Sequence, residues 1–248
     1  MGIPQARAFL AAHADPVDDL LLWADASPPL GRLSRIWELR RGNEARALAF
    51  SFPLWPATPS LGIKGLSPTD EGEALAALVE AGVYHNGYVI CGEAQVGLWQ
   101  GTGHRELHMT LDAAEWRVEP RVGVREAGLA EIDAFYTAQG AEAWHPIQVE
   151  TGPYVVVEED GIVAAAGTHF AYPGLAQVGN VFTAPGARGR GLATRCTAAV
   201  VDRLVGQYPT ISLFVDETNQ AAIQIYSKLG FRARRALHAF PWTAERAL

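Results

Sequence analysis

Residues 181–194 combine glycines, arginines and the start of a predicted helix in a way that suits an anionic ligand. They read Val-Phe-Thr-Ala-Pro-Gly-Ala-Arg-Gly-Arg-Gly-Leu-Ala-Thr, between an apolar run at 176–183 and a helical pattern at 192–205. Glycine lets the backbone approach a ligand closely, and the first amides of a helix have no internal acceptor. We therefore expect a pyrophosphate here, with Arg188 and Arg190 adding charge-assisted hydrogen bonds. The alternative is a solvated turn of similar composition.

Two other phosphate-binding motifs do not fit this segment. A P-loop requires a lysine after its glycines, and residues 181–194 contain none. The dinucleotide fingerprint requires Gly-x-Gly-x-x-Gly directly after a strand, whereas residues 189–194 end in threonine and the preceding strand is predicted to end at Thr183. Asp216 lies near where a ribose-binding acid would stand, which keeps a nicotinamide oxidoreductase as an alternative.

A second motif follows at the expected distance. Residues 219–231 read Asn-Gln-Ala-Ala-Ile-Gln-Ile-Tyr-Ser-Lys-Leu-Gly-Phe. Together with Arg-Gly-Arg-Gly-Leu-Ala at 188–193, this order resembles the GNAT superfamily of N-acetyltransferases, whose loop reads Arg/Gln-x-x-Gly-x-Gly/Ala and whose later helix ends in Tyr-x-x-Leu-Gly-Phe. The resemblance covers roughly residues 118–240, and residues 1–117 carry neither motif.

The resemblance implies an α/β fold, with a mixed, mostly antiparallel sheet that is splayed at two parallel strands and flanked by helices. The parallel strands would be 176–183 and 210–215, with acetyl-CoA in the opening between them. Backbone groups of Val181 and Thr183 would pair with the pantetheine amides, Phe182 would point to the opposite face, and one amide would polarise the thioester carbonyl. The resemblance implies these acetyl-CoA contacts: Val181, Phe182, Thr183, Arg188, Gly189, Arg190, Gly191, Leu192, Ala193, Thr194, Asn219, Ala222 and Tyr226.

Two residues are expected to act in catalysis. By resemblance, Tyr226 lies near the CoA sulfur and donates a proton to the leaving thiolate; the alternative is an aromatic residue packed in the core. A general base is harder to assign. His169 is our choice because a histidine has a suitable pKa, but Glu150, His145 and Asp216 stay open, as does a chain of water molecules.

The elements around these motifs favour two similar halves. In the second half, a hairpin at 154–170 turns at Asp160-Gly161. Strands predicted at 36–40 and 45–52 form a comparable hairpin, followed by a proline-rich loop at 53–59, a helix over 70–81 and a strand over 87–91. We therefore expect a catalytic domain at 118–248 and an N-terminal α/β region at 1–117 that is a degenerate GNAT-like copy, the two forming a tandem pair. The alternative is a chance likeness between α/β segments.

Composition limits the remaining possibilities. The 248-residue chain has a formal net charge of -7 and a pI of about 5.5, which argues against a general nucleic-acid binder. It has no apolar run long enough for a membrane span and no signal segment. Cys91 and Cys196 form neither a disulfide framework nor a zinc motif, so reduced thiols in a cytoplasmic protein without a metal are expected.

The predicted function is transfer of an acyl group from acetyl-CoA to a primary amine of a small molecule or peptide, by direct attack in a ternary complex. The acceptor is not readable from the sequence, and a homodimer is left open. The alternative is a non-catalytic CoA-binding sensor or interaction module.

Overall fold

A computed structural model describes residues 2–55, 58–117, 123–141 and 144–246. The chain forms two compact units. The first comprises Met1–Glu106 and Ala236–Leu248, and the second Leu107–Arg235. The predicted domain boundary at 117/118 adjoins residues 118–122, which lie outside the described residues, so the domain assignment stays a prediction.

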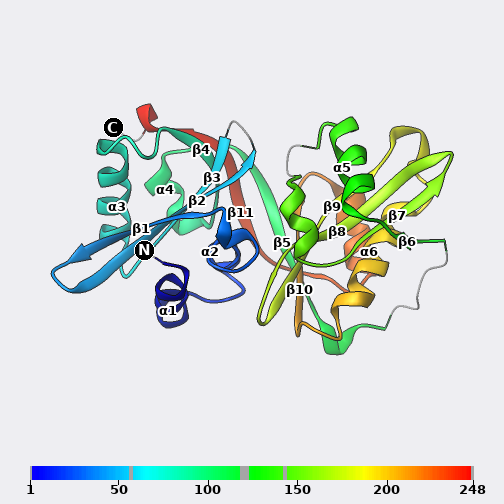
Figure 1. Cartoon of the computed structure of the whole chain (residues 1–248), viewed down its shortest axis with the longest axis horizontal. Coiled ribbons are helices and arrows are strands. Elements are labelled where there is room, and N and C mark those ends of the chain that lie inside the picture. Colours follow the sequence, from blue (N-terminus) through cyan, green and yellow to red (C-terminus); the bar gives the residue numbers. More distant parts are fainter. Residues whose placement is uncertain (1, 56–57, 118–122, 142–143, 247–248) are drawn as a thin grey trace. The chain divides into compact units, whose positions relative to one another are not determined.

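The first unit contains a sheet with strand order β1-β2-β3-β4-β11, in which β3 and β4 are parallel. The last part of β11, from residue 238 to 243, pairs antiparallel with β4 (Figure 1). Its elements are α1 (Ile3–His13), α2 (Leu20–Asp25), η1 (Leu30–Arg32), β1 (Arg35–Arg41), β2 (Glu44–Trp55), β3 (Thr58–Gly65), α3 (Pro68–Glu80), β4 (Asn86–Cys91), α4 (Glu93–Trp99), the end of β11 (Arg232–Thr243) and η5 (Ala244–Arg246).

Alternation along β2 gives this sheet two apolar faces. Ala47 and Ala49 join the core beneath α3 and α4, whereas Leu48 and Phe50 join the core beneath α1 and α2. Successive side chains of a strand point to opposite faces, so one strand supplies both cores. Helices therefore cover both sides of the sheet.

The proline-rich loop predicted at 53–59 is wrong for most of its length. β2 continues to Trp55, and β3 begins at Thr58. The ladder between β2 and β3 is irregular between Phe52 and Trp55, and Pro53 and Pro59 have no partner in the register. A proline cannot donate to a ladder but is tolerated where pairing is irregular, so the prolines mark a distortion of the hairpin and not its absence.

The second unit contains the strand order β5-β10-β9-β8-β7-β6 (Figure 1). The helix predicted at 192–205, the helix of the second motif and the hairpin at 154–170 are all present. The elements are β5 (His104–Asp112, which begins in the first unit), η2 (Ala113–Glu115), β6 (Arg125–Glu126), α5 (Leu129–Ala138), η3 (Pro146–Glu150), β7 (Tyr154–Glu159), β8 (Gly161–Tyr172), β9 (Leu175–Thr183), η4 (Pro185–Ala187), α6 (Leu192–Leu204), β10 (Thr210–Asp216), α7 (Gln220–Lys228) and the start of β11.

Helices cover both faces of this second sheet as well. Residues of α6 and α7 share one core with alternate residues of β8, β9 and β10, whereas α5 packs on the opposite face. The order of hairpin, antiparallel strand, helix, parallel strand and helix is the same in both units. The expected α/β fold, with a mostly antiparallel sheet containing parallel strands, is confirmed.

Two smaller findings bear on the sequence analysis. Cys91 and Cys196 are both buried, and neither takes part in a disulfide in the described structure. Among the helices that the structure describes, none combines the length and apolar character needed to cross a membrane.

Candidate active site

β9 and β10 pair in parallel over only a short stretch. The register joins Thr210 to Leu175 and ends where Ser212 meets Gln177, although β9 continues to Thr183. Beyond this point the two strands part, and their facing amide and carbonyl groups need other partners. The second unit therefore has an opening between parallel strands of the kind that the GNAT resemblance implies.

A bulge in β9 lies within this diverging stretch. Ala165 of β8 pairs with Phe182 and Gly167 pairs with Gly179, so β9 carries one extra residue between the two pairs. Asn180 lies there with φ of 53°, in the left-handed region that asparagine tolerates better than most residues. The bulge redirects the backbone of β9 just before Val181.

A buried polar network holds this bulge. Asn180 Nδ2 donates to Gln148 Oε1 over 2.8 Å and to the hydroxyl of Tyr154 over 2.9 Å. The hydroxyl of Tyr136 donates to the carbonyl oxygen of Asn180. Because Gln148, Tyr154 and Tyr136 are buried, breaking one of these bonds would leave polar groups without partners. The network thus ties β9 to α5, η3 and β7.

The loop after β9 leads into an uncapped helix start. Gly189 and Gly191 have φ of 77° and 72°, conformations that favour glycine, and no side chain caps α6. A Cβ added at either glycine would meet no heavy atom within 4 Å, so the space above the loop is open. The first amide bonded back into the helix turn is that of Arg195, to the carbonyl of Gly191. The amides before it, including those of Leu192, Ala193 and Thr194, are oriented for an anion.

The two arginines of the loop differ in their contacts. Arg188 Nε donates to the carbonyl oxygen of Thr183 over 3.2 Å, which keeps its exposed guanidinium beside the loop. Arg190 forms a two-bond ion pair with Glu159, which lowers the pKa of that carboxyl group. Arg188 is therefore the better placed of the two to meet a ligand, since Arg190 would first have to leave Glu159.

Successive side chains along the open edge of β9 point to opposite faces of the sheet, as expected. Val181 packs on the core beneath α6, whereas Phe182 packs on the opposite core, against Phe135 of α5. Thr183 Oγ1 is buried and has no hydrogen-bond partner in the described structure. An unpaired buried hydroxyl is costly unless a ligand completes it, so Thr183 fits a polar ligand at this edge.

The second motif forms α7, whose start and end are both functional candidates. Asn219 caps the helix by accepting from the amide of Ala222 over 3.1 Å, and its Nδ2 is not used in the cap. Tyr226 is 7% exposed and packs edge-on against Phe231. Burial raises the pKa of Tyr226 to about 12, so the phenol stays protonated at neutral pH.

His169 is also an extra residue in its strand. Thr168 pairs with Val178 and Phe170 with Gln177, so His169 forms a second bulge in β8. A Cβ on Gly179 would lie 2.7 Å from the Cβ of His169, so the glycine leaves room for the ring. Burial lowers the pKa of His169 to about 4, and the imidazole is therefore neutral at pH 7.

Two of the other candidate bases, His145 and Asp216, have structural roles in their own segments. His145 Nδ1 accepts from the amide of Ile147 at the start of η3, and Asp216 accepts from the amide of Thr218 over 2.7 Å. Glu150 lies exposed at the end of η3. Across the described part of the chain, no cluster of three or more histidine, cysteine, aspartate or glutamate residues could hold a metal ion.

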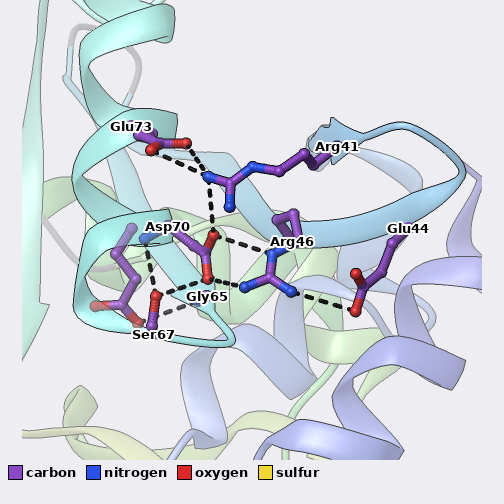
Figure 2. Close-up of polar contacts among 8 residues, drawn as sticks. Arg41, Glu44, Arg46, Gly65, Ser67, Asp70 and Glu73 are labelled. Carbon is purple, nitrogen blue, oxygen red and sulfur yellow. Dashed lines mark hydrogen bonds and ion pairs between the residues drawn. The ribbon is translucent and has the colours of Figure 1, made fainter.

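The corresponding helix start in the first unit is closed by the protein's own side chains. Ser67 caps α3, and its hydroxyl donates to Asp70 over 2.7 Å, while Arg46 binds the same carboxylate with two bonds (Figure 2). Glu71 accepts from the amide of Gly65 over 3.1 Å. The carboxylates of Asp70 and Glu71 interact favourably with the positive end of the helix dipole, but they repel a further anion such as a phosphate. The start of α3 is therefore closed by side chains of the protein, whereas the start of α6 is open.

Known proteins confirm the class of the second half. Residues 114–231 match the model of the Acetyltransferase (GNAT) family. This segment, a little under half of the chain, carries the sequence pattern of a GNAT acetyltransferase domain.

Particular relatives extend the likeness. A mycothiol acetyltransferase from Streptomyces avermitilis is 31% identical over 144 residues, 49% of this chain and 46% of that protein. The matches span less than half the length of the curated relatives. A GNAT-family protein from Novosphingobium aromaticivorans has a TM-score of 0.65 at 24% identity, covering 92% of this chain and 97% of that one. A tandem GNAT protein from the clavulanic acid biosynthesis pathway has a TM-score of 0.55 at 14% identity, covering 88% and 85%. At these identities the two structures show the shared fold alone.

Sequence reasoning missed the residues that shape the opening. Asn180, Gln148 and Tyr154 have no role in either motif, and nothing in their spacing indicates that they meet. The one available signal is an asparagine inside an apolar strand, a residue type that strands disfavour and left-handed positions accept.

Proposed function

We propose that the second unit transfers an acetyl group from acetyl-CoA to a primary amine by direct attack in a ternary complex. One observation carries the proposal: the unpaired edge of β9 ends in a loop whose glycines open the start of α6. A carrier with a phosphorylated end and an amide-containing arm needs both features in this order. The arm pairs with a strand edge, and the phosphates meet helix amides.

Each contact has a physical reason. The pyrophosphate accepts from amides over residues 189–194, and Arg188 adds charge. Backbone groups of Val181 and Thr183 pair with the amides of the arm, and the hydroxyl of Thr183 gains its missing partner. Asn219 Nδ2 provides a further donor from the start of α7, next to Ala222.

The chemistry is an acyl transfer. The amine nitrogen forms a bond to the thioester carbonyl carbon, the carbon–sulfur bond breaks, the nitrogen loses a proton and the sulfur gains one. A backbone amide of the diverging strand stabilises the negative charge on the carbonyl oxygen. Tyr226 donates to the departing sulfur. A phenol with a pKa of about 12 stays protonated through the working pH range, so this donor is present in every cycle.

His169 is the proposed partner of the amine. Its lowered pKa makes it neutral and able to accept a hydrogen bond, but it disfavours a lasting imidazolium. The histidine therefore orients the amine while the proton passes to water. His169→Gln retains an acceptor without a titrating group, and we expect it to keep most of the turnover. A large loss in that variant would instead make His169 the base.

Thiol release from acetyl-CoA with a panel of primary amines tests the function. Gly191→Asp places a carboxylate at the helix start and should abolish acetyl-CoA binding and turnover. Gly191→Asn is the matched control, because it has the same size and tolerates the left-handed conformation without the charge. Retained binding in folded Gly191→Asp would contradict the proposed site. Binding without release on any amine would favour the non-catalytic module.

A further inference from the structure

Gln177 of β9 and Ser212 of β10 lie side by side at the last position where the parallel strands pair. They mark the closed end of the opening, with Gly179 and Phe214 next along each strand. Neighbours on either side, Ala176 and Leu213, belong to the core beneath α6. Gln177 and Ser212 therefore face the opposite side of the sheet, where His169 also lies above Gly179.

Both side chains are buried without a hydrogen-bond partner. Gln177 is 1% exposed and Ser212 0% exposed. Among the described residues, Gln177 Nε2 and Ser212 Oγ have no protein partner. An amide or hydroxyl buried in this way destabilises the fold, and an apolar side chain of equal size would serve packing better. Two such groups together at the end of an opening indicate a polar ligand atom.

We propose that Gln177 and Ser212 bind an oxygen of the acyl acceptor, so that the enzyme selects primary amines that carry a hydroxyl or carboxamide group beside the amino group. The inference rests on the proposed function. Gln177 Nε2 and Ser212 Oγ are both hydrogen-bond donors, and their common partner is an oxygen with lone pairs. A hydrocarbon in the same place would leave both donors unpaired, and sites of this type reject such analogues strongly.

Matched pairs of amines test the proposal. Serinol is compared with pentan-3-amine, and alaninamide with 3-methylbutan-2-amine, because each pair has the same shape with and without oxygen. Rates are expressed per concentration of unprotonated amine, since the members differ in basicity. We expect the wild-type protein to prefer the oxygen-bearing member at least about tenfold in kcat/KM.

Two variants test whether Gln177 and Ser212 cause the preference for oxygen-bearing amines. Gln177→Met keeps the side-chain shape, and Ser212→Ala is a second, smaller change that covers failure of the first to fold. Each should reduce the preference severalfold, leave the KM for acetyl-CoA unchanged and leave the thermal stability equal or higher. Thr197→Val is the control, because Thr197 Oγ1 is likewise buried and unpartnered but lies in α6. It should not change the preference.

The outcomes separate the two proposals. Turnover of all four amines with no preference for oxygen would overturn the acceptor site and leave the acetyltransferase function standing. The same holds if folded Gln177→Met and Ser212→Ala both keep the wild-type preference. Acetyl-CoA binding without thiol release on any of the amines would overturn both proposals.

Discussion

Asn180 Nδ2 donates a 2.9 Å hydrogen bond to the hydroxyl of Tyr154, directly beneath the bulge that turns β9 away from its ladder. The same nitrogen reaches Gln148 in η3. Asn180 therefore has two roles: its backbone adopts the left-handed conformation, and its side chain ties this position to β7 and η3. The position of the Val181 backbone, where the arm of the carrier is proposed to pair, depends on this anchor.

Replacing Asn180 should separate the two roles. Asn180→Gly keeps the left-handed backbone but leaves Gln148 and Tyr154 unpaired, so we expect a loss of about 1–3 kcal/mol in unfolding free energy. Asn180→Ala adds backbone strain of about 1 kcal/mol. Both should weaken acetyl-CoA binding, as measured by calorimetry beside urea denaturation. Gln100→Gly, at another left-handed position (φ of 47°), is the control and should leave binding unchanged. Intact binding in both Asn180 variants would show that the bulge does not position the site.

Tyr226→Phe should lower kcat about 100-fold and change the KM for acetyl-CoA by less than about twofold. The variant removes a donor that acts only as the sulfur departs, and losses of this size are typical of general acids. Steady-state thiol release measures both constants. Tyr84→Phe is the control: its hydroxyl donates to the Phe50 carbonyl in the first unit, so the change should reduce stability and spare kcat. Unchanged kcat in Tyr226→Phe would rule out the donor role.

Asp25 should make the protein less stable as the pH rises. The carboxyl group is 8% exposed, and burial raises its pKa to about 8, whereas an unfolded aspartate has a pKa near 4. Between these values the folded state holds the proton more tightly. The contribution is thus fully present below about pH 4 and is lost as the pH approaches 8, with a slope of up to about 1.4 kcal/mol per unit.

Asp25→Asn should remove this slope and raise the unfolding free energy at pH 8 above that of the wild type. Urea denaturation at pH 5 and pH 8 measures both effects. Glu80→Gln, which removes an exposed carboxylate at the end of α3, should leave the slope unchanged. A wild-type stability that is flat from pH 5 to 8 would contradict the buried-acid interpretation.

Asp70 should make the protein less stable as the pH falls, the opposite of the effect expected for Asp25. The guanidinium of Arg46 and the hydroxyl of Ser67 lower the pKa of this carboxyl group. Its contribution is present above the ordinary carboxyl pKa and is lost as the pH falls below it. Asp70→Asn should lower the melting temperature at pH 7 and flatten the acid-induced decline. Glu73→Gln, which removes the exposed partner of Arg41, should have a smaller effect, and equal effects would contradict a special role for Asp70.

The sequence was most informative where local chemistry decides the structure. Gly230, the glycine of Tyr-x-x-Leu-Gly, has φ of 97°, the left-handed conformation expected of a glycine that ends a helix, and Asn219 caps α7. Glycine and asparagine signal such positions by themselves because few other residues tolerate them. The opening between β9 and β10 also followed from the motif resemblance.

Elements that depend on distant contacts were not predicted. No element was assigned to α1 or to β5, although Leu107, Met109 and Leu111 alternate as a strand requires. The pairing of Gln177 with Ser212, and of Asn180 with Gln148, joins residues more than thirty positions apart. Such contacts are set by the register between strands, which composition does not reveal.

One of the two strands that flank β4 in the first unit comes from residues after Ala236, so the sheet of that unit is completed only after the second unit has been translated. The residues of the core beneath α6 all lie between Leu107 and Phe231, so they are translated before that last strand. The residues that complete the first sheet are therefore the last of the two units to become available during synthesis.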